Sequence, residues 1–168
     1  TMSIATSESP LVLAAVNPGE GVTTWDLTTQ QALATLPADQ LITDVAISRD
    51  ARMVVGAGVN GLNIWEYTRT THHLTGSTVH GVAFSPDNRF VASGDEDGVL
   101  IIWDLNGNAL RRYQAHREPI STVMYDPTDP TTVMTAALDG TIRQWRADDL
   151  DTLLTWTQDN RDIRILSG

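Results

Sequence analysis

Short apolar runs alternate with polar turns that contain glycine and proline along most of the chain. Residues 42–61 hold a β-type run, a polar turn, a second run and a turn that closes on glycine. Residues 79–98 and 120–140 repeat this order, and a weaker version occupies 4–21. Runs rich in Val and Ile, punctuated by Pro, Asp, Asn and Gly, are typical of strands joined by hairpins. The pattern therefore predicts an all-β protein.

Tryptophan recurs at a nearly constant spacing and divides the chain into four periods. The intervals are 40, 38 and 42 residues, and they separate Trp25, Trp65, Trp103 and Trp145. A polar stretch and a fourth weak strand follow each tryptophan, such as QQALATL and NALRRYQ. Four short strands in about 40 residues is the period of a β-propeller blade.

These periods resemble those of the WD-repeat β-propeller family. Trp25-Asp26 and Trp103-Asp104 give the WD dipeptide itself, and Trp65-Glu66 and Trp145-Arg146 are variants of it. The resemblance covers about residues 4–148 and implies four blades of four antiparallel strands. We expect these blades at about 1–28, 29–68, 69–106 and 107–148.

The C-terminal stretch 149–168 is predicted to be a short helix plus a tail. Leu150, Leu153, Leu154 and Thr157 recur at helical spacing, and aspartates crowd the first turn. The alternative is that LLTWT forms the last outer strand. The stretch also resembles the closing helix of large bacterial WD-repeat signalling proteins, so we expect this chain to be part of such a protein.

A hydrogen-bonded network commonly braces the blades of this family, and the resemblance assigns it residue by residue. The last period matches throughout, with His116, Thr135, Asp139 and Trp145. A buried imidazole, carboxylate and indole N–H need partners, and these groups can satisfy one another. The alternative is a catalytic relay with Thr135 as nucleophile. We expect the structural role.

The other periods depart from this pattern. The third keeps three network positions, namely Ser93, Asp97 and Trp103. Thr75 stands at its histidine position, so Asp97 lacks an imidazole partner. The second period has Ala38 and Asn60 at the histidine and aspartate positions. We therefore expect irregular blades within the same fold class.

Composition narrows the range of functions. The net charge is -10 and all eleven basic residues are arginine, which argues against nucleic-acid binding. Cysteine is absent, so disulfides, thiolate catalysis and cysteine-ligated zinc are excluded. No apolar stretch reaches the roughly 18 residues of a membrane span, and no secretory signal opens the sequence. We expect a cytoplasmic protein without a membrane partner.

Two clusters invite a metal-site interpretation. Asp95, Glu96 and Asp97 supply carboxylates of the kind that calcium prefers. Adjacent side chains on a strand point to opposite faces, so we expect an exposed hairpin turn instead. His72 and His73 are consecutive, and such pairs rarely converge on one ion without further ligands. We predict no metal and no cofactor.

Three glycines in VVGAGVNG resemble part of a dinucleotide-binding fingerprint. They are Gly56, Gly58 and Gly61. That fingerprint requires a helix after the glycines, whereas NIWEY continues here as a strand. We interpret the glycines as room for a tight turn and close strand packing.

Partners of WD-repeat propellers usually contact one rim, formed by the loops that enter the first strands and the turns before the third strands. By the resemblance, the matching residues are Asp44, Asn60, His80, Asp95, Glu96, Glu118 and Leu138. The set is mainly acidic, so a basic protein segment or peptide is the natural ligand.

The sequence therefore predicts a non-enzymatic scaffold or sensor that recognises other proteins. Four blades are few for this family, because WD-repeat propellers usually close with about seven blades, within the general range of 4–8. We expect a larger ring, completed by further blades of a longer polypeptide or by a second copy. A propeller hydrolase or lyase is the less favoured alternative, because the sequence shows only scattered histidines and exposed acids.

Overall fold

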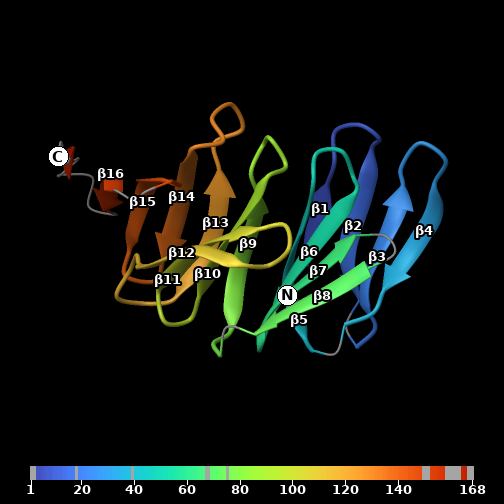
Figure 1. Cartoon of the computed structure of the whole chain (residues 1–168), viewed down its shortest axis with the longest axis horizontal. Coiled ribbons are helices and arrows are strands. Elements are labelled where there is room, and N and C mark those ends of the chain that lie inside the picture. Colours follow the sequence, from blue (N-terminus) through green and yellow to red (C-terminus); the bar gives the residue numbers. More distant parts are fainter. Residues whose placement is uncertain are drawn as a thin grey trace.

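Four separate antiparallel sheets stand in a row in this molecule (Figure 1). The computed structural model describes residues 3–17, 19–38, 40–66, 69–74, 76–148, 152–157 and 164–165. Within these residues every regular element is a strand, and none is a helix that could cross a membrane. The all-β prediction is confirmed.

The first two sheets are here called blades 1 and 2, and each is a meander in which neighbouring strands follow one another in sequence. Blade 1 contains β1 (Ile4–Thr6), β2 (Val12–Asn17), β3 (Gly21–Asp26) and β4 (Gln31–Leu36). Blade 2 contains β5 (Ile42–Ile47), β6 (Met53–Gly58), β7 (Gly61–Glu66) and β8 (Arg69–Leu74).

The last two sheets, blades 3 and 4, repeat this topology, and blade 4 gains a fifth strand. Blade 3 contains β9 (Val79–Phe84), β10 (Phe90–Asp95), β11 (Val99–Asp104) and β12 (Ala109–Gln114). Blade 4 contains β13 (Ile120–Tyr125), β14 (Thr132–Ala137), β15 (Thr141–Arg146), β16 (Thr152–Thr157) and β17 (Arg164–Ile165).

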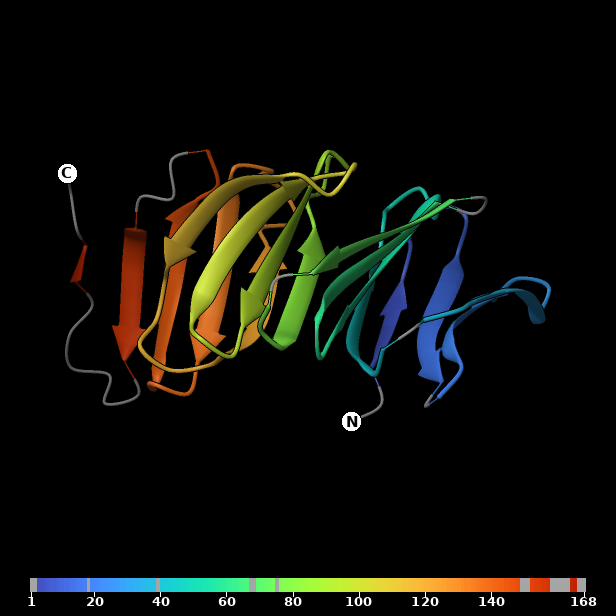
Figure 2. The ribbon, with the colours of Figure 1, turned by 60° about the horizontal axis from the view of Figure 1, so that its bottom comes forward.

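Consecutive blades pack face to face, and Figure 2 shows them following one another along the row in sequence order. The first strand of each blade is its innermost strand, and β1, β5, β9 and β13 lie beside one another in that order. Three apolar cores result, one between each pair of neighbouring blades. Burial of both sheet faces explains the continuous apolar run of β11.

The predicted C-terminal helix is wrong, and the alternative of an outer strand is what the structure contains. Residues 152–157 form β16, which pairs antiparallel with β15. The outer edge of β15 offers unpaired backbone groups, and pairing with them overrides the local helical spacing of the leucines. Leu150 and its neighbours 149 and 151 lie outside the described residues.

The sequence repeat and the blade are offset by one strand. Residues 31–36 close blade 1 as β4, although the tryptophan period assigns them to the second repeat. The same holds for β8 and β12. Each predicted repeat boundary therefore falls before the outer strand of a blade, because the tryptophan lies on the third strand and not on the last.

Candidate protein-recognition surface

The network assigned to the fourth period is assembled between blades 3 and 4. The indole N–H of Trp145 donates to the Thr135 hydroxyl at 2.8 Å, and that hydroxyl lies 2.7 Å from His116 Nε2. On the other side of the ring, Nδ1 lies 3.0 Å from Asp139 Oδ2. His116, Thr135 and Trp145 are each at most 1% exposed. The four groups therefore form one chain of hydrogen bonds that is buried except at its Asp139 end.

The protonation state of His116 follows from these contacts. Burial lowers the pKa of His116 and outweighs the opposing influence of Asp139, so the imidazole is neutral. Burial alone would raise the pKa of Asp139, but hydrogen bonds from Thr141 and His116 bring it to about 2. Because Asp139 is an anion, the single ring proton belongs on Nδ1, and Nε2 accepts from Thr135.

Blade 3 contains a reduced version of the network. Trp103 donates its indole N–H to the Ser93 hydroxyl at 2.8 Å. Asp97 accepts a hydrogen bond from the hydroxyl of Ser77, which occupies the loop where a histidine is missing. Thr75, which was assigned to the histidine position, lies outside the described residues. A serine thus gives the Asp97 carboxylate a local donor.

In blade 2 the tryptophan finds a backbone partner instead. Trp65 donates its indole N–H to the carbonyl oxygen of Pro37 at 3.1 Å. Gly56 occupies the position of Ser93 and Thr135 in the other blades, as the strand register shows. A Cβ at Gly56 would lie 2.8 Å from the Trp65 ring, so the glycine makes room for the indole.

The acidic turn between β10 and β11 is held by local hydrogen bonds. Asp95 is 1% exposed and accepts the backbone N–H groups of Asp97 and Val99 at 3.1 and 2.8 Å. Glu96 accepts the backbone N–H of Thr78 at 3.0 Å. Asp95 therefore does not project from the rim as the sequence suggested, because its side chain turns inward to cap the turn.

Burial has an electrostatic consequence for Asp95. It raises the pKa of this carboxyl, against the lowering effect of the two backbone donors. The second oxygen, Oδ2, has no hydrogen-bond partner within the described residues. No group of three or more His, Asp or Glu in the described part of the chain is arranged to hold a metal ion.

Asp44 also has an internal role. Its carboxylate accepts the Ser3 hydroxyl at 2.5 Å and the backbone N–H of Val82 at 3.1 Å. These partners belong to the segment before β1 and to β9, so Asp44 on β5 links the inner parts of three blades. Its oxygens are engaged in joining blades, although it was predicted as a rim contact.

An open pocket of about 660 Å³ lies where the ends of the inner strands meet. Predicted rim residues His80 and Leu138 line it together with Leu41, Pro119 and Ile120. Leu138 is 71% exposed and Leu41 is 58% exposed. Leu41 and Pro119 were not among the predicted rim residues, although each stands directly before an inner strand, where the family rim begins.

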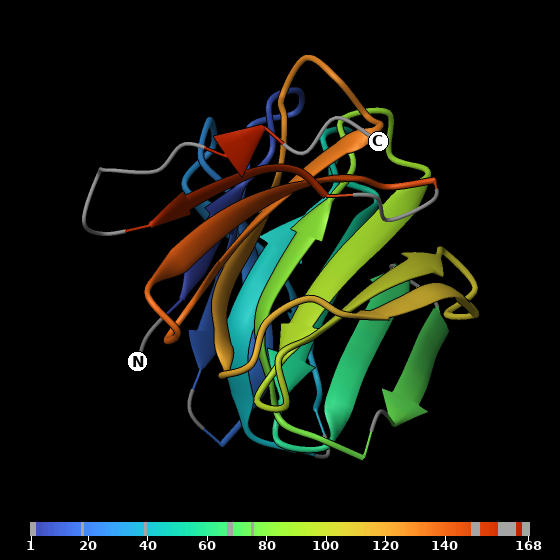
Figure 3. The ribbon, with the colours of Figure 1, turned by 90° about the vertical axis from the view of Figure 1, so that its left-hand side faces the viewer.

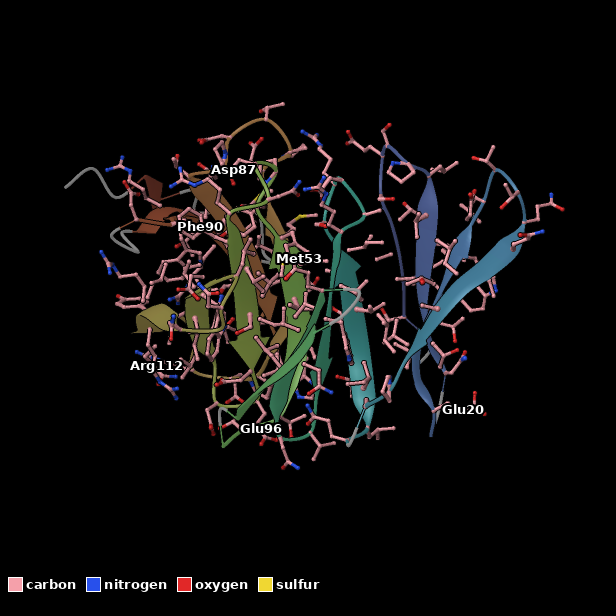
Figure 4. The ribbon with its side chains drawn as sticks, turned by 45° about the vertical axis from the view of Figure 1, so that its right-hand side comes forward. Glu20, Met53, Asp87, Phe90, Glu96 and Arg112 are labelled. Carbon is pink, nitrogen blue, oxygen red and sulfur yellow. The ribbon has the colours of Figure 1, made fainter. Side chains whose placement is uncertain are left out.

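Exposed carboxylates lie at the same end of the blades as this pocket. In Figure 4, Glu20 and Glu96 project at one end of the molecule, and Asp87 lies at the other end. Glu118 and Asn60, both predicted rim residues, are exposed, and Glu118 directly precedes pocket residue Pro119. This end of the blades thus presents a mainly apolar pocket together with exposed acids, and we call this surface the Leu138 rim.

The remaining sequence candidates do not form a second site in the described part of the chain. Gly58 and Gly61 belong to the β6–β7 hairpin, so a strand follows the glycines where a dinucleotide site needs a helix. His72 and His73 lie on β8, and their side chains are outside the description.

Comparison with known proteins agrees with the repeat pattern. The family described as "WD domain, G-beta repeat" matches residues 65–104 and 107–146. The matches begin at Trp65 and end just after Trp145, which reproduces the period marked by the tryptophans. They cover the sequence from the third strand of blade 2 to the third strand of blade 4.

Two curated proteins are similar over part of their length. "Protein groucho" of Drosophila melanogaster is 30% identical over 118 residues, which is 66% of this chain and 16% of that protein. "Periodic tryptophan protein 2 homolog" of Dictyostelium discoideum is 34% identical over 88 residues, 49% of this chain and 10% of that protein. The matched regions thus span less than a fifth of either relative. With its tryptophan networks and its row of four sheets, this chain contains repeats of the WD family at residues 65–104 and 107–146.

Proposed function

We propose that this chain is a non-enzymatic recognition module that binds segments of other proteins at the Leu138 rim. The observation that carries the proposal is the open pocket, whose exposed apolar side chains, Leu41 and Leu138, are held by the ends of packed strands. Loops on a rigid scaffold are suited to recognition, because binding then orders few groups.

The chemistry of the rim indicates the class of partner. An apolar side chain of the partner would enter the pocket beside Leu41 and Leu138, where burial of apolar area favours binding. Arginine or lysine residues next to that anchor would face Glu96 and Glu118, and the overall charge of -10 would attract them from a distance. The proposed ligand is therefore a basic peptide segment with an apolar anchor.

Short random peptides displayed on phage test this proposal. Selection on the chain should enrich sequences with one aliphatic or aromatic residue flanked by Lys or Arg. Leu138→Asp should weaken binding of a synthetic enriched peptide by at least about tenfold. Leu33→Asp is the matched control, because Leu33 is 48% exposed on the outer strand of blade 1. Equal loss in both variants would contradict a site at the rim.

The charge component has a separate test. Glu96→Lys and Glu118→Lys should slow association with the same peptide at low salt and have less effect at high salt, because salt screens exposed charges. Association rates that are unchanged by both substitutions would show that Glu96 and Glu118 do not steer the ligand.

The position of the His116 network supports the non-enzymatic part of the proposal. Thr135 would be the nucleophile of the alternative catalytic relay, and its side chain is buried in the core between two blades. Its hydroxyl is engaged by both Trp145 and His116. A substrate would have to separate the blades to reach it, so the network is suited to bracing.

Ring completion is a second role, favoured by the two uncovered ends of the row. Within the described residues, the cores join blades 1 to 2, 2 to 3 and 3 to 4 only. We propose that further WD-repeat blades cover both ends and that the completed propeller works as a cytoplasmic scaffold or sensor, as in a bacterial signalling protein. The mass of the assembly tests one source of these blades, which is a second copy of the chain.

A further inference from the structure

Each tryptophan of the repeat faces the blade that precedes its own. Trp65 of blade 2 belongs to the core shared with blade 1, and Trp103 of blade 3 belongs to the core shared with blade 2. Trp145 of blade 4 likewise packs in the core shared with blade 3. These three side chains are 2%, 5% and 0% exposed. The tryptophan face of a blade is thus built to receive a neighbour.

Blade 1 has such a face without a neighbour among the described residues. Leu13 pairs with Trp25 and Thr6 across the sheet, so the three side chains share one face. An open pocket of about 390 Å³ lies on it, and its lining includes Ile4, Leu13 and Trp25. Ile4 is 62% exposed and Trp25 is only half-buried. We call this surface the Trp25 face.

Blade 4 has the complementary face. The residue three positions before each tryptophan points to the following blade, and Val22, Leu62 and Leu100 at this position are 0% exposed. Its counterpart in blade 4, Ile142, is 47% exposed, and Met124 is 52% exposed. The register places Met124 and Ile142 on one side of the sheet. Figure 3 views the molecule from this end, with blade 4 in front. We call this surface the Ile142 face.

We propose that the Trp25 face of one copy of this chain binds the Ile142 face of a second copy. The inference rests on the proposed ring completion and names its partner. Every contact between neighbouring blades joins a tryptophan face to an aliphatic face, and the described residues leave one face of each kind uncovered. Two such head-to-tail contacts related by a two-fold axis close a ring of eight blades, within the range of propellers.

The mass of the assembly tests the proposal. Light scattering and native mass spectrometry should find twice the 18.3 kDa of one chain. Trp25→Lys and Ile142→Lys should each give a monomer, because each places a charge in both contacts of the ring. Leu110→Lys is the control and should stay dimeric, since Leu110 is 40% exposed on β12 of blade 3, on neither end face. Circular dichroism verifies that each variant is folded.

Mixing the two monomeric variants distinguishes this geometry from others. Each variant keeps one intact face, so an equal mixture should recover a dimer that has a single contact. A face that binds its own copy would instead be broken by only one of the substitutions, and that result would overturn the proposal. Folded wild-type monomer at the highest concentration, or an open series of oligomers, would also overturn it.

Recognition at the Leu138 rim can fail or succeed independently of this contact. Leu138 lies on the β14–β15 turn and not among the residues of either end face. Leu138→Asp should therefore leave the dimer intact while it weakens peptide binding. A monomeric wild type that still binds the peptide would remove the second-copy inference and leave the recognition module standing.

Discussion

Trp145 donates its indole N–H to the Thr135 hydroxyl at 2.8 Å, and Trp103 makes the same bond to Ser93 at 2.8 Å in the preceding blade. Both hydroxyls lie on the second strand and are 1% exposed. The Thr135 hydroxyl differs in that it also meets His116. One side-chain oxygen therefore connects the indole of blade 4 to the loop that enters this blade.

Replacing Thr135 should separate the polar role from the packing role of this residue. Thr135→Val keeps the shape but leaves the Trp145 N–H and His116 Nε2 without their partner, so we expect a loss of about 1–3 kcal/mol in unfolding free energy. Thr135→Ser keeps the hydroxyl and should lose less. Urea unfolding measures both. A valine variant as stable as the serine variant would show that the hydroxyl contributes nothing.

Acid should destabilise the fold through His116. Its pKa is lowered by burial in the folded state, so the unfolded chain binds the proton more readily as the pH falls below the ordinary value of 6.5. The stabilising contribution of His116 is therefore fully present above pH 6.5 and declines as the pH drops. Unfolding free energies measured between neutral pH and about pH 5 should show this slope. His116→Gln should flatten it, whereas an unchanged slope would assign it to other groups.

Protonation of Asp139 should cause a second loss of folding stability at lower pH. Its folded pKa of about 2 lies below the ordinary value of 3.8. The carboxylate therefore stabilises the fold above pH 3.8, and this contribution disappears as the pH falls toward 2. Asp139→Asn should lower stability at neutral pH and reduce the acid-dependent loss. An identical acid transition in Asp139→Asn and the wild type would contradict this assignment.

Ionisation of Asp95 should destabilise the fold, whereas ionisation of Asp139 stabilises it. Burial raises its pKa, so its ionised form is disfavoured in the folded state, and the associated stability is lost as the pH rises through the folded pKa. Asp95→Asn keeps an oxygen for the N–H groups of Asp97 and Val99 and removes the charge. Urea unfolding at pH 7 should find the variant at least as stable as the wild type. A loss above roughly 1 kcal/mol would mean that the carboxylate is needed.

Gly56 should tolerate no side chain while Trp65 keeps its position. The added Cβ of Gly56→Ala would meet the Trp65 ring at 2.8 Å and Ile42 at 3.2 Å, so we expect a loss of about 1–3 kcal/mol from overpacking. Gly19→Ala is the comparison, because it meets nothing within 4 Å and adds only strain from its positive φ. The melting temperature of Gly56→Ala should be well below that of Gly19→Ala, and the reverse order would refute the steric explanation.

The sequence alone determined the fold class and the repeat. Strand periodicity, turn residues and the spacing of Trp25, Trp65, Trp103 and Trp145 are local patterns, because each strand needs only its neighbours in sequence to form the meander. The network of His116, Thr135, Asp139 and Trp145 was predicted from the resemblance to the WD-repeat family, because the fourth repeat matches the family pattern at each of these positions.

Tertiary structure decided what local patterns leave open. Residues 152–157 carry helical spacing, yet the free edge of β15 draws them into β16, since backbone pairing across a sheet does not depend on that spacing. Asp95 and Glu96 are adjacent in sequence, but only Glu96 reaches solvent, because the turn points Asp95 toward its own backbone N–H groups. Whether Trp25 and Ile142 are covered depends on which blades lie beside blades 1 and 4. Packing between blades joins surfaces that are far apart in the chain, whereas a strand forms from a local pattern.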